Sequence, residues 1–324
     1  MSERFSGIKW LVRQRAFHVA IVLWLLLCGA GLLISRHTPS YRGLVVGSSR
    51  YLVLVVLMFG LVMLLTRKRP VPDLAQRAPE SSIARRETLV MWAYVAVVMV
   101  AGRLIGQHFF GEGIAMHLNG SLLGATRVQS PIEVYTWAAY NGILLALIPY
   151  LVFRMRGYSN QQLSLKSANL KSDVLVIIVV LAFSVGIDMM GPNIFQLTRH
   201  QQLVGGLMSF WFHLFGTDLP VMIVIYSILM PRYFKLFSPM TAYLLGAVSY
   251  PTIHIFESGT RYDSITAAAM SLTFVYLLFI PAGLMKSFLT WRTGNAWVHV
   301  WAYHAISPHV TVDTRLIVSD FGIK

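Results

Sequence analysis

Four ionisable residues lie inside or at the ends of long apolar runs in the C-terminal half of the chain: Asp218, His254, Glu257 and His304. Ionisable groups are costly in an apolar environment, so they are the first candidates for function. Two imidazoles beside a carboxylate could activate water, with Asp218 or Glu257 as the base and the histidines holding or polarising the water. The set could also bind a divalent metal, although it contains no cysteine ligand. The competing interpretation is that the histidines only form hydrogen bonds between helices.

Three histidines recur at a spacing of five: His299, His304 and His309. Five residues of α-helix leave neighbouring side chains about 140° apart. We therefore expect these imidazoles to diverge, and a three-histidine zinc site on one helix is not expected. The other ionisable residues within apolar runs are Arg103, Asp188 and His213.

The composition excludes a water-soluble protein. Of 324 residues, 56% are hydrophobic and 12% are charged, against roughly 25% charged in soluble domains. The mean hydropathy is +0.62, and the single cysteine, Cys28, excludes a disulfide scaffold. The net charge of +14 does not indicate nucleic-acid binding, because no basic stripe lies on an aqueous domain. The sequence predicts an integral protein of the lipid bilayer.

Apolar runs of about 20 residues are long enough to cross a membrane as helices. The sequence predicts an all-α, polytopic membrane protein with eight or nine transmembrane helices. Gly216 and Pro220 make a break in the sixth helix one of two outcomes that the sequence allows. The expected helices are 17–35, 44–66, 88–106, 133–153, 173–191, 205–231, 239–256, 265–285 and 294–311.

Basic residues predict the orientation. They gather before the first helix and in alternate loops, the last of which contains Lys286 and Arg292. The positive-inside rule then places the N-terminus in the cytoplasm. Nine helices would place the C-terminus outside, and eight would return it to the cytoplasm.

Polar segments suggest the domain organisation. The stretch 67–87 contains three prolines and separates a two-helix unit from the remaining helices. We expect a membrane unit at 1–66, a cytoplasmic linker at 67–87, two helices with a long outer loop at 88–153, a membrane core at 154–311 and a tail at 312–324.

Several motifs in the core resemble one known family. Residues 231–254 read PRYFKLFSPMTAYLLGAVSYPTIH, and 292–297 read RTGNAW, followed by His304-Ala305. Together with Arg156-Gly157-Tyr158-Ser159, this pattern resembles the core of the CPBP (Abi) intramembrane proteases, which include the CAAX prenyl endopeptidases. The resemblance covers residues 150–311. It implies a helical protease-like core in which His254 and His304 correspond to functional histidines.

The chain departs from that family at its first motif, Glu-Glu-x3-Arg. Alignment through Pro231 places the two glutamates on Val221 and Met222 and the arginine on Tyr226. None of these residues can act as an acid or base in the expected way. The nearest acid is Asp218, about one helical turn earlier.

These observations favour a degenerate family member and leave two other functions open. A degenerate family member would bind a membrane protein or peptide without cleaving it. A rebuilt site, with Asp218 or Glu257 in place of the lost glutamate, would hydrolyse a peptide bond. A transporter or lipid-handling protein would instead need a polar path lined by Asp188, Asp218 and His213. The resemblance implies a bacterial inner membrane as the location.

Overall fold

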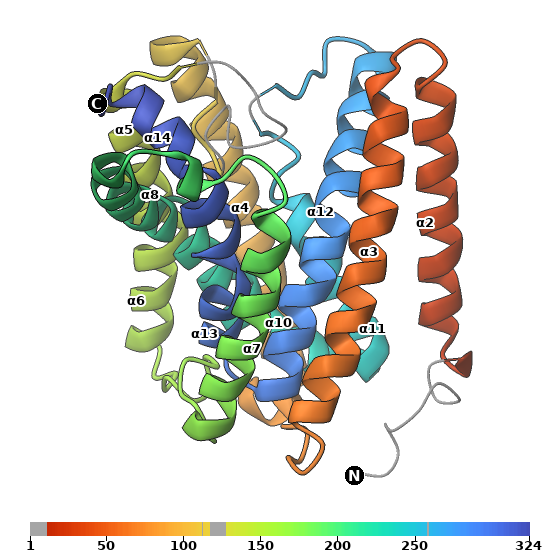
Figure 1. The fold of residues 1–324 in the computed structure, drawn as a ribbon. Helices are drawn as coiled ribbons and strands as arrows, with labels where there is room; N and C mark the ends of the chain where they lie inside the picture. The colour runs from red at the N-terminus through yellow and green to blue at the C-terminus, as the bar shows by residue number, and fades with distance from the viewer. Residues whose placement is uncertain (1–11, 112, 117–127, 258) are drawn as a thin grey trace.

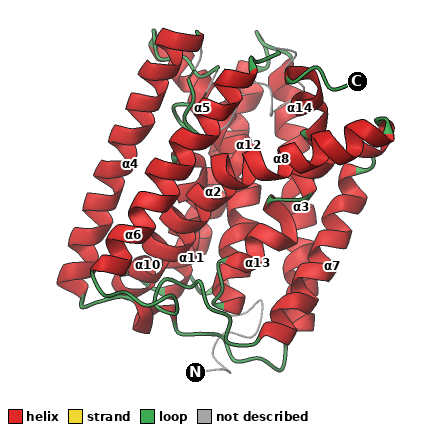
Figure 2. Ribbon diagram, turned by 90° about the vertical axis from the view of Figure 1, so that its left-hand side faces the viewer, coloured by secondary structure: helices red, strands yellow, loops and turns green. Residues whose placement is uncertain are grey.

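Helices make up the fold that the computed structural model shows for residues 12–111, 113–116, 128–257 and 259–324 (Figure 1). In this described part of the chain there is no β-strand (Figure 2). The predicted all-α class is therefore confirmed.

Among the described residues, seven helices are long and apolar enough to cross a membrane. Their apolar runs meet the length of about 20 residues that a bilayer requires. The chain is a helical multi-pass membrane protein by this criterion. The seven are α2 (Arg15–Ile34), α3 (Ser40–Leu65), α4 (Ser81–Phe110), Pro131–Met155, α7 (Leu170–Asp188), Gln201–Leu236 and α12 (Ile265–Thr293).

Two of these long helices contain π-helical turns, in which hydrogen bonds join residues five apart. Pro131–Met155 consists of α5 (Pro131–Asn141), the π-helix η3 (Gly142–Leu147) and α6 (Ile148–Met155). Gln201–Leu236 consists of η5 (Gln201–Gly205), α8 (Gly206–His213), η6 (Leu214–Asp218), α9 (Leu219–Val221), η7 (Met222–Leu229) and α10 (Met230–Leu236), of which η5, η6 and η7 are π-helical.

Shorter helices complete the C-terminal half. The helix α11 (Pro239–Thr252) has 14 residues, which is fewer than a bilayer crossing requires. The last helical segments are α13 (Trp297–His299), the π-helices η8 (Val300–His304) and η9 (Ser307–Val312), and α14 (Thr314–Asp320). The 3₁₀ turns η2 (Leu74–Arg77) and η4 (Ile194–Gln196) lie in connecting segments.

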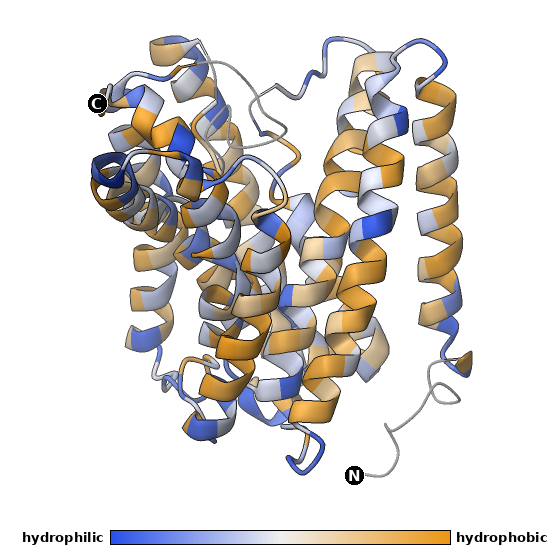
Figure 3. Cartoon of the chain, viewed as in Figure 1, coloured by the Kyte–Doolittle hydropathy of each residue, from blue (hydrophilic) through white to orange (hydrophobic). Residues whose placement is uncertain are grey.

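The central element is the helix Gln201–Leu236. In its most apolar window 89% of the residues are buried, against 6% in α2. The helix α2 stands beside α3 at the edge of the bundle (Figure 1), and its exposed face is apolar (Figure 3). An exposed apolar face on a helix of this length is suited to lipid contact. The candidate residues His213 and Asp218 of the central helix are instead buried inside the bundle.

The structure decides between the two outcomes left open at Pro220 and shifts several of the predicted helix boundaries. Helix 205–231 is continuous across Pro220, because adjacent π-helical turns accommodate a residue without a backbone N–H. Helix 239–256 ends earlier, at Thr252, one residue after Pro251. Helix 265–285 continues to Thr293, because its last turns carry polar side chains that are buried against neighbouring helices.

The helices α11 and α12 approach each other too closely for a side chain at Gly283. A Cβ there would lie 2.2 Å from the backbone oxygen of Ala247. We expect Gly283→Ala to lower the free energy of unfolding by about 1–3 kcal/mol, the usual cost of overpacking. Gly60→Ala is the matched control, because a Cβ at Gly60 meets no atom within 4 Å. Thermal unfolding in detergent measures both, and equal melting temperatures would contradict the close approach.

Candidate functional site

The structure brings two of the four sequence candidates into contact. Asp218 ends η6 in the central helix, and His304 ends η8. The Nδ1 atom of His304 lies 2.9 Å from Oδ1 of Asp218, and both side chains are almost wholly buried. Counted from the cytoplasmic ends of their predicted helices, Asp218 and His304 fall at a similar depth, and the structure places them side by side.

The histidines spaced by five do not diverge, so that expectation was wrong. The ring centroids of His299 and His304 are 6.3 Å apart, and those of His304 and His309 are 5.1 Å apart. The cause is the backbone: η8 and η9 are π-helical, and a π-helix brings residues five apart into register. The estimate of 140° assumed an α-helix.

A set of five buried residues extends from this pair, which we call the His–Asp cluster. His309 places Nε2 at 3.7 Å from Asp218 Oδ1 and Nδ1 at 2.8 Å from Asp313 Oδ2. His213 Nε2 lies 3.6 Å from the same Asp313 oxygen. The cluster is therefore a continuous row of side chains across two helical segments: His304, Asp218, His309, Asp313 and His213.

His254 packs against Tyr250, a residue that also contacts His304. Its Nδ1 is 2.6 Å from the Tyr250 backbone oxygen, and its ring packs on Phe279 with the ring centroids 4.1 Å apart. The Tyr250 hydroxyl in turn lies 3.4 Å from His304 Nε2. The two histidines expected to act together thus both contact Tyr250, each in a T-shaped arrangement with its ring.

Glu257 lies in the turn that follows α11. The helix ends at Thr252, and the Glu257 backbone N–H donates to the His254 carbonyl at 3.0 Å in that turn. The Asp218 side chain contacts the side chain of a candidate histidine, His304.

Lys286 is the main residue near the site that the sequence analysis missed. It had been assigned to a cytoplasmic loop, but α12 includes it and its side chain is fully buried. The ammonium nitrogen lies 3.4 Å from the centroid of the Tyr250 ring. It also interacts electrostatically with Asp218. A lysine beyond the expected helix end gave no local signal of burial, because its partners are distant in sequence.

Arg103 and Asp188, two other charged residues within the apolar runs, also have partners in the structure. Arg103 donates to the Thr260 carbonyl at 2.7 Å and lies over the Tyr262 ring. The Asp188 carboxylate accepts a hydrogen bond from the Ser307 hydroxyl.

The Arg-Thr-Gly-Asn sequence at 292–295, which is part of the family resemblance, lies at the end of α12. Gly294 terminates α12 with φ +66°, and a Cβ at this residue would meet Arg77 and Pro72. Asn295 donates to the Asp173 carboxylate at 2.8 Å. The Arg-Thr-Gly-Asn sequence thus joins α12 to the segment between α3 and α4 and to α7.

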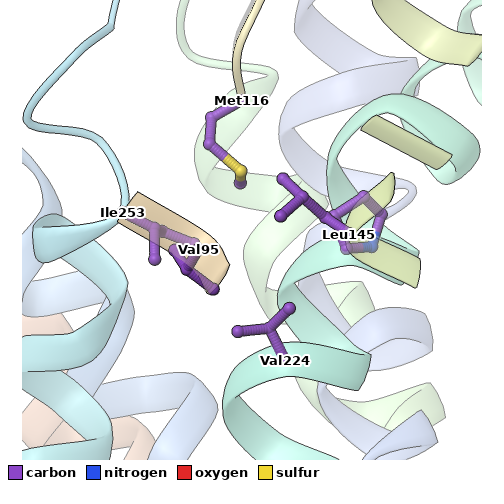
Figure 4. Close-up of a pocket in the computed structure, with 6 residues that line it drawn as sticks. Val95, Met116, Leu145, Val224 and Ile253 are labelled. Carbon is purple, nitrogen blue, oxygen red and sulfur yellow. The ribbon is translucent and has the colours of Figure 1, made fainter. Parts of the chain in front are cut away.

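Two pockets lie outside the His–Asp cluster. One is an apolar crevice too narrow to hold a water molecule, lined by Val95, Met116, Leu145, Pro220, Val224 and Ile253 (Figure 4). The other is a polar hollow of about 400 Å³ lined by Asp73, Gln76, Arg77, Ser159, Gln161 and Gln162. Burial and the neighbouring Arg69 lower the pKa of the Arg77 guanidinium.

Two overlapping sets in the cluster have the composition of a metal site. Asp218, His304 and His309 form one set, and His213, His309 and Asp313 form the other. In each set the three ligand atoms lie within 4.8 Å of one another. Nitrogen and carboxylate oxygen are the ligands that zinc accepts in catalytic sites.

Comparisons with models of known protein families, with curated proteins and with solved structures found no match for the chain.

Proposed function

We propose that the chain is a membrane-embedded hydrolase that cleaves a peptide bond at a site built around Asp218 and His304. The observation that carries this proposal is the 2.9 Å contact between the two side chains inside the helix bundle. A carboxylate beside an imidazole is the arrangement that general-base activation of water requires. The contact favours a rebuilt site over the degenerate family member that only binds a partner.

The resemblance to the CPBP proteases supports a peptide as the substrate class. His304 occupies the position of one of that family's histidines, and Asp218 lies one turn before the position of its lost glutamate. An acid from a neighbouring turn can reach His304 because η6 is π-helical and shifts the register of the central helix. The substitution of one acid for another is therefore geometrically consistent with the fold.

The proposed reaction consumes water. The Asp218–His304 pair accepts one proton from the water as the water oxygen bonds to the peptide carbonyl carbon. The C–N bond then breaks, and the accepted proton passes to the leaving amine. Tyr250, whose hydroxyl lies 3.4 Å from His304 Nε2, is placed to orient the imidazole through a hydrogen bond.

We infer from the basic loops and from the resemblance that the protein lies in a bacterial inner membrane with its N-terminus in the cytoplasm. The structure has the loop between α3 and α4 at one end of the bundle and the C-terminus at the other (Figure 1). A C-terminus on the outer side is consistent with that arrangement. Fusion of a reporter enzyme to the C-terminus tests the orientation.

Profiling of new peptide ends in membranes tests the hydrolysis. Cells that express the wild-type chain are compared with cells that express His304→Ala, and the control is His37→Ala, at an exposed histidine. We expect His304→Ala to reduce cleavage by roughly 100-fold or more, the usual contribution of a general base or acid. The control should retain cleavage.

Other results would reject the proposal. A stable copurifying membrane peptide or protein, without cleavage by the wild-type chain, would support the degenerate binding protein. Solute flux in vesicles that is lost on Asp218→Asn, again without cleavage, would support the transporter.

A further inference from the structure

Three atoms in the His–Asp cluster surround one point: Asp218 Oδ1, His304 Nδ1 and His309 Nε2. The oxygen is 2.9 Å from the first nitrogen and 3.7 Å from the second. Two ligands that are each about 2.1 Å from a tetrahedral zinc ion lie about 3.4 Å from each other. The observed separations are on either side of that value, so side-chain adjustments of a few tenths of an ångström would suffice.

His309 is oriented as a metal ligand usually is. Its Nδ1 lies 2.8 Å from the Asp313 carboxylate, so the N–H group is on Nδ1 and donates to Asp313. The lone pair is then on Nε2, which faces Asp218. Metal-bound histidines typically donate their other ring N–H to a carboxylate or carbonyl group, which fixes both the tautomer and the ring orientation.

His304 has a compatible arrangement. Its Nε2 is 3.4 Å from the Tyr250 hydroxyl oxygen, which can accept an N–H. In that tautomer the lone pair on Nδ1 faces the Asp218 carboxylate. Two lone pairs and a carboxylate oxygen then converge, and they repel one another unless a cation lies between them.

The environment of Asp218 is an independent reason to expect a cation at this position. Its carboxylate is fully buried, and in the part of the chain that the structure describes no group donates a hydrogen bond of good geometry to either oxygen. A buried carboxylate needs a cation or several donors. Lys286 supplies one positive charge in the neighbourhood, but its ammonium group sits on the face of Tyr250.

The second set is a poorer fit. The rings of His213 and His309 stack with centroids 4.3 Å apart and an angle of 13° between their planes. The lone pair of an imidazole nitrogen lies in the plane of its ring, so two nearly parallel planes do not converge on one ion. The planes of the His304 and His309 rings are inclined by 45° and therefore intersect, and their ligand nitrogens lie within 4.8 Å of each other.

We propose that Asp218, His304 and His309 bind one divalent transition-metal ion of the zinc class, and that Asp313 positions His309 for it. Three protein ligands leave a fourth position for water, as in catalytic zinc sites. A zinc-bound water loses its proton near neutral pH. With the ion bound, Asp218 and His304 would hold it, and the ion would replace their direct proton acceptance in activating the water. This role rests on the proposed hydrolysis, whereas the binding of the ion does not.

Elemental analysis of the purified protein tests the site. The full chain is purified in detergent with an affinity tag that lacks histidine, stripped with a chelator, incubated with zinc chloride and freed of excess zinc. We expect about one zinc ion per chain in the wild type. We expect less than a tenth of that in His309→Ala. The control, His299→Ala, removes another buried histidine of the same segment and should retain the zinc.

The Asp313→Asn variant tests whether Asp313 orients His309 without itself binding the metal. This variant keeps all three ligands but weakens the partner of His309 Nδ1, so we expect the zinc affinity to fall by about 10- to 100-fold. Size-exclusion profiles identify any variant that fails to fold. The site is rejected if folded wild-type protein retains no zinc, or if His309→Ala retains as much as the wild type.

The same measurements distinguish this site from the proposed function. Zinc bound in the wild type, without peptide cleavage under any condition, would leave the site in place and reject the hydrolase. Cleavage that persists at full rate in chelator-treated, zinc-free protein would support the hydrolase and reject the metal site.

Discussion

Replacing Glu87 with glutamine is expected to lower the free energy of unfolding by about 3–5 kcal/mol, the cost of leaving a buried ion without its partner. Glu87 accepts a hydrogen bond from Arg232 Nε at 2.8 Å and forms an ion pair with Arg232 Nη2 at 2.6 Å. Both side chains are about 1% exposed. The Glu87 carboxylate also accepts from the Tyr158 hydroxyl at 2.9 Å and contacts Arg156 at 2.7 Å. Glutamine keeps the shape of the side chain but removes the charge that compensates Arg232.

Thermal unfolding in detergent, or unfolding by titrated sodium dodecyl sulfate, measures the loss. Glu80→Gln is the matched control, because Glu80 lies at the start of the same helix, α4, and is exposed. Its substitution should change the stability by less than about 0.5 kcal/mol. If the two variants unfolded alike, the Glu87–Arg232 pair would not be a stabilising contact between α4 and α10.

Glu87 also illustrates how far the sequence analysis could reach. It was assigned to the end of a polar linker, whereas it lies inside α4 and is 3% exposed. Its main partner, Arg232, is 145 residues away. Hydropathy is a property of a short window, so it predicts where apolar helices lie. It contains no information on a buried ion pair whose members come from different helices.

In the candidate site, too, features of a single helix could be predicted and contacts between helices could not. The depth of Asp218 and His304 could be predicted because each position follows from the length of its own helix. Their contact at 2.9 Å agrees with that prediction. The place of His309 in the cluster could not be predicted, since it depends on π-helical turns for which the sequence offered no recognised signal. Whether Asp218 and His304 are catalytic stays a prediction.

Lys286 and Tyr250 were missed for another reason. The lysine lies beyond the apolar run that defined helix 265–285, and a tyrosine in an apolar helix is unremarkable by composition. Only the packing of α11 on α12 places the Lys286 ammonium group on the Tyr250 ring. Contacts between helices, rather than properties of either helix, define this part of the site.

Which of the two candidate acids serves the reaction decides whether the site has been rebuilt as proposed. We expect Asp218→Asn to reduce peptide cleavage by roughly 100-fold or more, because asparagine cannot accept the proton or hold the charge that develops on His304. Glu257→Gln should have a smaller effect, below tenfold. Glu257 follows the end of α11 and adjoins His254, whereas Asp218 directly contacts His304.

The pair of variants is informative because each substitution preserves the shape of the side chain. Cleavage rates are measured on protein purified in detergent, with a substrate peptide identified by the profiling of new peptide ends, and circular dichroism reports whether each variant keeps its helices. A larger loss in Glu257→Gln than in Asp218→Asn would assign the reaction to Glu257 and His254. That result would make the Asp218–His304 contact structural, although the Tyr250 ring packs against both histidines.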